Sequence, residues 1–172
     1  RFGSDVIYGS KTTAYDLKPE ESQTIELALN NKFEKLDSEI VLFNTNIKDK
    51  IEVVSKNDGT AAKYYTSENL DKVNINGIEL NLDYIFTNSF DVGFNTTFLD
   101  TEDKTTNKEL TYTPDLSSSL SLNYKVLTDL STNLVFRYIG EQYTNSSNTE
   151  KTDDYTLVDL GLNYDLNKKT TL

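Results

Sequence analysis

Four residue types are missing from this chain of 172 residues, which contains no cysteine, histidine, methionine or tryptophan. Without cysteine there is no disulfide, no thiolate zinc site and no cysteine nucleophile. Without histidine the commonest general base and the commonest metal ligand are also missing. The sequence therefore predicts a protein that is not an enzyme, with no catalytic residue, no resident metal and no cofactor.

The absence of methionine also bears on the extent of the chain. A complete translated chain begins with methionine, whereas this one begins at Arg1 and stops inside a strand pattern at Leu172. We therefore expect a piece of a longer protein, with any signal peptide outside it. No apolar run approaches the roughly 20 residues that a membrane helix needs.

Positive charge is scarce, with 17 Lys and Arg against 28 Asp and Glu and a net charge of −11. Nucleic acid is therefore not expected as a partner, because binding it requires clustered Lys and Arg. Only 36% of the residues are hydrophobic, yet 11 Tyr and 8 Phe argue against disorder. A sheet with one apolar face and one wet face reconciles these two observations.

The clearest pattern in the sequence is Val73–Leu99, two alternating runs joined by the polar turn Thr87-Asn88-Ser89. Successive side chains on a strand point to opposite faces. One face of this predicted hairpin is therefore apolar and aromatic, and the other is polar and acidic. The apolar face needs a cover, which is either protein or lipid.

Similar alternation continues along the chain and predicts strands at 22–33, 36–54, 63–86, 90–99, 115–126, 130–140 and 154–166, with an eighth strand opening at 170. The facing of 36–54 stays open, because Ile40 and Leu42 lie in one phase and Phe43 and Ile47 in the other. A phase slip at Gly77 predicts a β-bulge. Residues 1–20 are expected to be mostly loop, with a strand end near Val6–Tyr8.

The predicted connections alternate strictly between short turns and long polar loops, and aromatic residues mark the apolar phase beside the short turns. A soluble sandwich, the alternative architecture, requires neither regularity. A transmembrane β-barrel has both, together with aromatic girdles at its interfaces. We therefore expect an all-β fold, an antiparallel meander of long strands that forms an arc of a larger transmembrane β-barrel surrounded by lipid.

Six short motifs, in order, resemble those of the TonB-dependent outer-membrane receptors. The first looks like the family's N-P-x-L-x-P-E-x-S segment, with Ala14-Tyr15 where Asn-Pro is usual; the third looks like A-x-I-x-G-x-E. The motifs are Asp16–Ser22, Asn46–Ile51, Val73–Glu79, Tyr112–Pro114, Arg137–Gly140 and Tyr155–Asp159. The resemblance covers nearly the whole chain and places it in the C-terminal part of the barrel.

This resemblance implies a barrel of about 22 strands with a plugged lumen, in the outer membrane of a bacterium. Residues 1–172 would be a partial barrel domain, with the plug domain and the final strand outside the chain. The implied function is active transport of a scarce metal chelate (a ferric siderophore, haem or cobalamin), energised by the TonB complex through a missing N-terminal region. The pattern is most similar to the siderophore, colicin-receptor and cobalamin branch.

An autonomous outer-membrane barrel with a structural or adhesive role, without energised transport, is the alternative function. That alternative predicts a closing C-terminal strand, which Thr170-Thr171-Leu172 does not provide.

Four residues are candidates for substrate binding. Tyr64, Tyr65 and Tyr143 border long loops, where they either stack on a ligand at the extracellular mouth or form the outer aromatic belt. Arg137 lies in the polar phase of its strand, where it either binds an anionic ligand or forms a salt bridge with an inward acid such as Asp159.

Two acidic runs, Asp100–Asp103 and Asp153-Asp154, supply oxygen atoms of the kind that Ca²⁺ binds. Neither run has the spacing of an EF-hand. We therefore expect both to be solvated loops.

Overall fold

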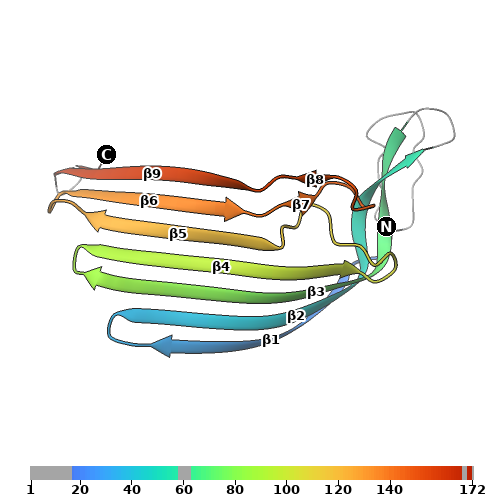
Figure 1. The fold of residues 1–172 in the computed structure, drawn as a ribbon, viewed down its shortest axis with the longest axis horizontal. Coiled ribbons are helices and arrows are strands. Elements are labelled where there is room, and N and C mark those ends of the chain that lie inside the picture. Colours follow the sequence, from blue (N-terminus) through green and yellow to red (C-terminus); the bar gives the residue numbers. More distant parts are fainter. Residues whose placement is uncertain (1–16, 58–62, 168–169, 172) are drawn as a thin grey trace.

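The computed structural model of the chain describes residues 17–57, 63–167 and 170–171. Its main sheet contains eight antiparallel strands in the order β1-β2-β3-β4-β5-β6-β9-β10, and β7 pairs with β8 in a second sheet (Figure 1). The strands are β1 Glu21–Lys32, β2 Leu36–Asn57, β3 Lys63–Thr87, β4 Phe90–Asp103, β5 Leu116–Lys125, β6 Leu130–Ile139, β7 Gln142–Tyr143, β8 Lys151–Thr152, β9 Tyr155–Asn167 and β10 Thr170–Thr171. None of these residues belongs to a helix with the length and apolar character of a membrane span.

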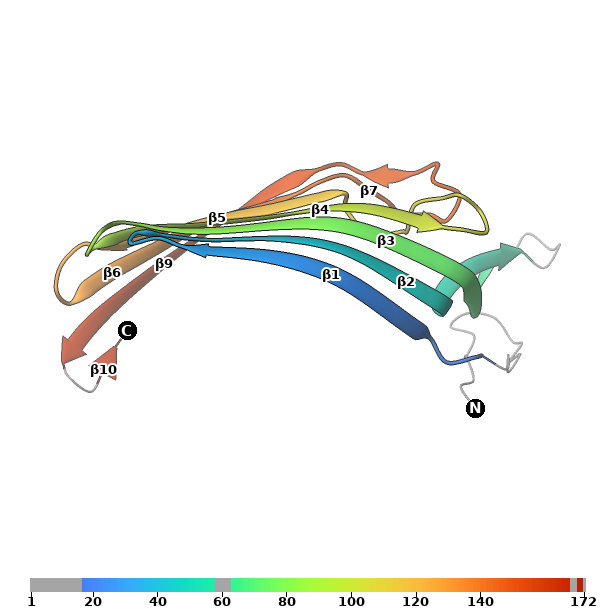
Figure 2. The ribbon, with the colours of Figure 1, turned by 90° about the horizontal axis from the view of Figure 1, so that it is seen from below.

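The main sheet is one curved layer with the long loops at one end and the short turns at the other (Figures 1 and 2). Among the described residues only Val73 and Leu110 are buried hydrophobic side chains. Many other apolar side chains are largely exposed, for example Leu27 at 68% and Leu160 at 69%. An open all-β sheet with this surface confirms the predicted meander and leaves one face in need of a cover.

The register of the strands assigns each residue to a face, because directly paired residues point to the same side. One row across four strands is Leu82, Phe94, Leu120 and Phe136, all apolar. The neighbouring row is Asn81, Asn95, Ser119 and Arg137, all polar. We call these two sides the apolar face and the polar face.

Aromatic side chains join across the strands beside the short turns, on the apolar face. Tyr84 and Phe86 meet edge to face with centroids 4.6 Å apart, and Phe86 stacks on Phe90 at 5.3 Å. Phe90 meets Tyr124 edge to face at 6.1 Å. The aromatic row predicted from the sequence is therefore confirmed as a continuous set of ring contacts.

The bulge predicted at Gly77 is wrong. Pairing runs without a slip through Gly77, which lies opposite Phe43 of β2 and Leu99 of β4. A Cβ atom on Gly77 would lie 2.1 Å from Cζ of Phe43, so the glycine makes room for that ring. The change of phase in β3 therefore reflects apolar residues on both faces, and the bulge in this strand lies between Ile85 and Thr87.

The facing of β2, which the sequence left open, follows from the same register. Ile40 and Leu42 pair with Leu80 and Ile78 on the apolar face. Phe43 and Ile47 lie on the polar face, where they pair with Gly77 and with the fully buried Val73. Apolar residues switch sides because the loop end of the polar face is covered by protein.

Strand bounds agree with the sequence prediction except at the long loops. β4 extends to Asp103, so the predicted loop begins four residues too early, because pairing with β3 continues from Gly77 to Val73. β7 and β8 form a small hairpin inside the loop predicted at 141–153. The predicted strand end at Val6–Tyr8 lies outside the described residues.

Substitution by arginine distinguishes the two faces. Leu120→Arg places a charge at the middle of the apolar face and is expected to lower the free energy of unfolding by about 2–4 kcal/mol. Ser121→Arg, on the polar face near Asp83 and Asp159, is expected to be tolerated. Denaturant unfolding of the intact protein in lipid vesicles measures both, and equal losses would contradict the assignment of faces.

The contact between Gly77 and Phe43 predicts a compensating pair of substitutions. Gly77→Ala introduces a methyl group into the ring of Phe43 and should destabilise the protein by about 1–3 kcal/mol. In a Phe43→Ala background the same methyl group has space, so its cost should largely disappear. A double-mutant cycle by denaturant unfolding checks this, and additive effects would contradict it.

Candidate ligand-binding mouth

The packed part of the chain lies at the loop end of the sheet. Val73 is 0% exposed, Thr101 3% and Leu110 6%, where the segment after β4 folds back over the polar face. The backbone N–H of Leu110 donates to Oγ1 of Thr101 at 3.1 Å. This contact fixes the loop of residues 104–115 against β3 and β4.

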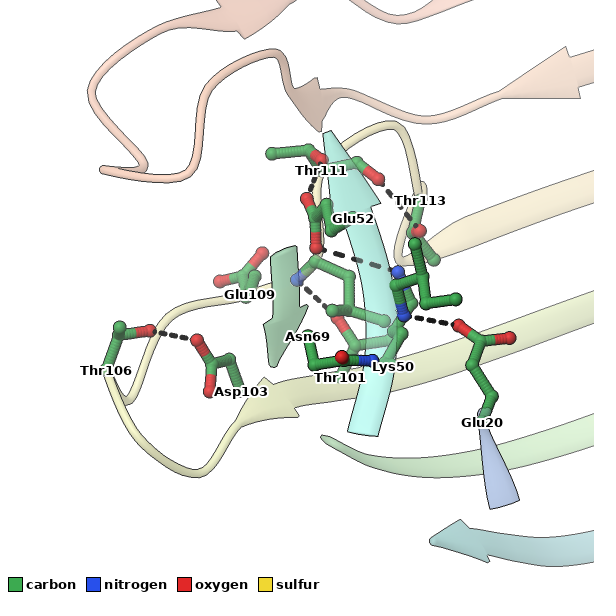
Figure 3. A network of polar contacts seen from close by, with 12 residues as sticks. Glu20, Lys50, Glu52, Asn69, Thr101, Asp103, Thr106, Glu109, Thr111 and Thr113 are labelled. Atoms are coloured by element: carbon green, nitrogen blue, oxygen red, sulfur yellow. Dashed lines mark hydrogen bonds and ion pairs between the residues drawn. The ribbon is translucent and has the colours of Figure 1, made fainter. Parts of the chain in front are cut away.

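A second contact ties this loop to the long β2–β3 hairpin (Figure 3). Thr111 Oγ1 donates to Glu52 Oε1 at 2.8 Å, and Lys50 Nζ lies 3.6 Å from Glu52 Oε2. Asp103, only 6% exposed, accepts from the Thr105 N–H at 2.9 Å. Carboxylates at the mouth are therefore engaged in holding loops.

The β2–β3 hairpin extends beyond the ends of β1 and β4, the strands on either side of it. Pairing with β1 stops at Lys48 and pairing with β4 stops at Val73, so β2 and β3 continue beyond this level as two strands. Asp49, at this point, has a φ of 52°. Its carbonyl oxygen accepts from Asn69 Nδ2 at 2.5 Å. Asn69 thus stabilises the backbone turn at the base of the projecting hairpin.

The two long loops on either side of β5 and β6 are joined to each other. Asn148 uses both ends of its amide: its Oδ1 accepts from the N–H of Glu109 at 2.7 Å, and its Nδ2 donates to the Glu109 carbonyl at 3.1 Å. The Tyr112 N–H donates to the carbonyl of Tyr143 at 2.8 Å. The loops of residues 104–115 and 140–154 therefore form one connected rim.

Two titratable groups at this rim, Glu109 and Lys151, have raised pKa values. Partial burial and then the neighbouring carboxylate of Asp115 raise the pKa of Glu109. Lys151 forms an ion pair with Glu141, whose hydrogen bond raises the pKa of the Lys151 ammonium. The rim thus holds the ion pair of Lys151 with Glu141 and an acid, Glu109, whose pKa is raised by burial and by Asp115.

Two of the candidate binding residues are placed by their contacts. Arg137, on the polar face in β6, forms an ion pair with Asp159 of β9, which is one of the alternatives that the sequence left open. Tyr143, in β7, lies beneath Lys151, whose Nζ is 4.6 Å from the ring centroid. Arg137 and Tyr143 come from neighbouring elements at the loop end of β6.

Tyr64 and Tyr65 lie in the projecting part of β3, opposite Lys56 and Ser55. The structure describes their backbone but not their side chains.

One of the two predicted acidic loops is a strand end in the structure, and the other lies between two strands. Asp100–Asp103 is wrong as a loop, because it forms the end of β4 and includes two buried residues, Thr101 and Asp103. Asp153 and Asp154 are exposed in the segment between β8 and β9, as expected. The described part of the chain contains no group of three or more acids that could hold a metal ion.

Sequence reasoning missed Glu52, Asn69, Thr111 and Asn148, which join the loops. No periodicity marks a hydrogen-bonding residue in an irregular segment. The motif at Tyr112–Pro114 lies beside Thr111 and is the one signal that points to this neighbourhood.

Asn148→Ala should loosen the connection between the two loops, because it removes both hydrogen bonds to the Glu109 backbone and leaves the one between Tyr112 and Tyr143. With about 1 kcal/mol for each bond, amide hydrogen exchange in residues 104–115 should accelerate roughly 5–30-fold. Asn88→Ala, at an exposed turn on the opposite end, serves as the control and should leave this exchange unchanged. Unaltered protection in Asn148→Ala would show that the loops are held independently.

Comparisons with known proteins agree with this architecture. The family described as TonB dependent receptor-like, beta-barrel matches residues 3–172. A comparison with curated proteins gives no match.

Solved structures match the chain as well. The copper transporter OprC is 17% identical with a TM-score of 0.79, over 95% of this chain and 26% of that protein. The ferric enterobactin receptor PfeA of Pseudomonas aeruginosa, in complex with BCV-L6, is 25% identical with a TM-score of 0.71, over 90% of this chain and 25% of that protein. The siderophore receptor PirA of Acinetobacter baumannii is 23% identical with a TM-score of 0.68, over 89% and 26%.

The chain thus spans about a quarter of the length of these solved relatives. They are receptors and transporters of the bacterial outer membrane, and none is an enzyme, in agreement with the sequence prediction. Barrels of this family lie in the outer membrane, so lipid covers the apolar face. The family match over nearly the whole length, together with the open meander and its two faces, shows that this chain belongs to the β-barrel domain of the TonB-dependent receptors.

Proposed function

We propose that this chain is a wall segment and part of the extracellular rim of a receptor that imports a metal chelate across the outer membrane. The observation that carries the proposal is the polar row of Asn81, Asn95, Ser119 and Arg137, which crosses β3 to β6 beneath a rim of connected loops. A polar wall beneath a structured rim suits passage of a hydrated ligand. An adhesive barrel has no need of such a path.

Energy for import would come from the TonB complex, through a part of the protein outside this chain. The plug that fills the lumen, and the final strand of the barrel, would likewise lie outside residues 1–172. Two relatives are described as siderophore or ferric enterobactin receptors and one as a copper transporter, which supports a metal or metal chelate as the substrate class.

Arg137 and Tyr143 are the best placed of the candidate ligand-binding residues. Arg137 has five N–H donors, of which the ion pair with Asp159 occupies only part, and its side chain is 50% exposed. Tyr143 and Lys151 together offer a ring and a positive charge at the rim. An anionic chelate such as a ferric siderophore fits this combination. Tyr64 and Tyr65 would add aromatic contacts from the projecting hairpin.

A deletion strain tests the function directly. Cells lacking the receptor should lose growth on one class of iron or copper chelate as the sole source of that metal, and the intact receptor should restore it. Uptake should stop when the proton-motive force is dissipated. Unchanged growth on every chelate would favour the structural or adhesive barrel.

Arg137→Ala should weaken chelate binding to the intact receptor roughly 10–100-fold, as expected for losing a hydrogen bond to a charged group. Lys125→Ala, which removes another cation from the polar face near the opposite end, is the control and should bind normally. The double variant Arg137→Ala/Asp159→Asn separates two roles. Recovery of binding in the double variant would show that Arg137 serves only to neutralise Asp159.

A further inference from the structure

Across β2, β3 and β4 the apolar face ends at one level of the sheet, whereas Ile25 of β1 continues it one row further, beside Asn44. Leu42, Ile78 and Phe98 form the last apolar row across β2, β3 and β4. Two residues further toward the loops, the same face presents Asn44, Asn76 and Asp100 in register. Amide groups are costly to bury in hydrocarbon, so this step marks the level at which the hydrocarbon of the outer leaflet ends.

Four asparagines in this row and the next row outward, Asn44 with Asn76 and Asn46 with Asn74, form a closed ring of hydrogen bonds, which we call the asparagine tetrad. Nδ2 of Asn44 donates to Oδ1 of Asn76 at 2.7 Å, and Nδ2 of Asn76 donates to Asn74 at 3.1 Å. Asn74 donates to Asn46 at 3.1 Å, and Asn46 donates back to Asn44 at 2.7 Å. A ring in which every amide both donates and accepts is cooperatively strengthened and fixes the orientation of all four side chains.

The four amides have N–H groups and lone pairs that the ring does not use and that a ligand could bind. Each carboxamide has two N–H groups and an oxygen with two lone pairs, and the ring uses one N–H and one lone pair of each. The second N–H of Asn76 goes to Asp100 Oδ2 at 3.3 Å. Closely spaced donors and acceptors of this kind suit a ligand rich in hydroxyl groups, because a hydroxyl also donates and accepts.

Positive charge follows one level further from the hydrocarbon. Lys48 pairs with Lys72 in the next outward row of the same face, and both side chains are exposed. The Lys104 backbone N–H donates to the Lys72 carbonyl at 2.9 Å, so a third lysine lies beside them, with its Nζ ion-paired to Glu102. Glu21 of β1 is paired with Lys48 in the same row, so Lys72 is the lysine of this row without an acid directly opposite it. Rows on one face lie about 7 Å apart. The apolar face therefore passes from aliphatic to amide to ammonium within about 20 Å.

A shallow hollow crosses the boundary between these layers. It has a volume of ≈ 370 Å³, and its lining includes Leu27, Leu42 and Ile78 below and Asn44, Asn76 and Asp100 above, with Ile25 of β1 beside Asn44. An amphipathic molecule with an apolar chain and a hydroxyl-rich head matches this division. The carboxylate of Asp100 disfavours a phosphate at the amide level, whereas the lysine row favours one further out.

We propose that the asparagine tetrad, the hollow beneath it and the lysines beyond it bind a membrane glycolipid of the outer leaflet. Its acyl chain occupies the hollow, its sugar hydroxyls bond to the tetrad and its phosphate contacts Lys48 and Lys72. The site continues the lipid-covered face and requires neither the plug nor transport. The proposal therefore stands or falls independently of the proposed function.

Lipid retention by the intact receptor tests the site. The purified protein is mixed with a diphosphorylated, acylated glucosamine disaccharide or with phosphatidylethanolamine, and bound lipid is counted by native mass spectrometry. The receptor should prefer the glycolipid, and Asn44→Ala/Asn76→Ala should reduce its retention about tenfold. Lys48→Gln/Lys72→Gln should abolish the preference for the phosphorylated over the dephosphorylated glycolipid.

Asn81→Ala/Asn95→Ala is the matched control, because it also removes two directly paired amides, from the polar face of the same sheet. Its glycolipid retention should equal that of the unmodified receptor. The heat-dependent electrophoretic shift of a folded barrel verifies each variant, and Asn46→Ala, which opens the ring at one corner, replaces a double variant that does not fold. Equal retention with and without the tetrad, or equal binding of phosphatidylethanolamine, would overturn the proposal.

Discussion

Hydrocarbon offers no hydrogen-bond partner to a polypeptide backbone, and this constraint decides the arrangement of the chain. Each strand of the main sheet must pair with its neighbours, so the chain forms a continuous meander with eight strands in one layer. Alternation then gives every strand one side for lipid and one for the lumen. A conventional core cannot form between two such sides, and the buried residues gather at the loop end instead.

The loop end therefore holds the rim together, at the place where we propose that a ligand is met. Thr111 and Asn148 attach irregular segments to the sheet and to each other through side-chain hydrogen bonds. Glu52 and Asp103 accept hydrogen bonds from the loop of residues 104–115. Acidic side chains at the loop end therefore help to order it. The groups that the proposed ligand would meet are then few, chiefly Arg137 and the Tyr143–Lys151 pair.

The meander, its faces and its aromatic row could be predicted, because period-two alternation reports directly which side of a strand meets lipid. Prediction was wrong at Gly77, where a phase change without a slip reflects a ring from β2 packed over the glycine. It was also wrong at Asp100–Asp103, since acidity suggests a loop while the pairing with β3 keeps a strand. The contacts of Asn148 depend on two loops meeting in space, and no single segment of sequence carries that information.

The length of the β2–β3 hairpin has a consequence outside the membrane. β3 has 25 residues, which at about 3.3 Å each is roughly 80 Å, whereas the apolar band of an outer-membrane barrel is about 25 Å tall. Beyond Lys48 and Val73 the described residues of the two strands pair with each other and with no third strand, and they bend away from the rest of the sheet (Figures 1 and 2). With the loop end outside the cell, as proposed, an antibody or a phage would meet this ribbon as a surface separate from the rim of residues 104–115 and 140–154.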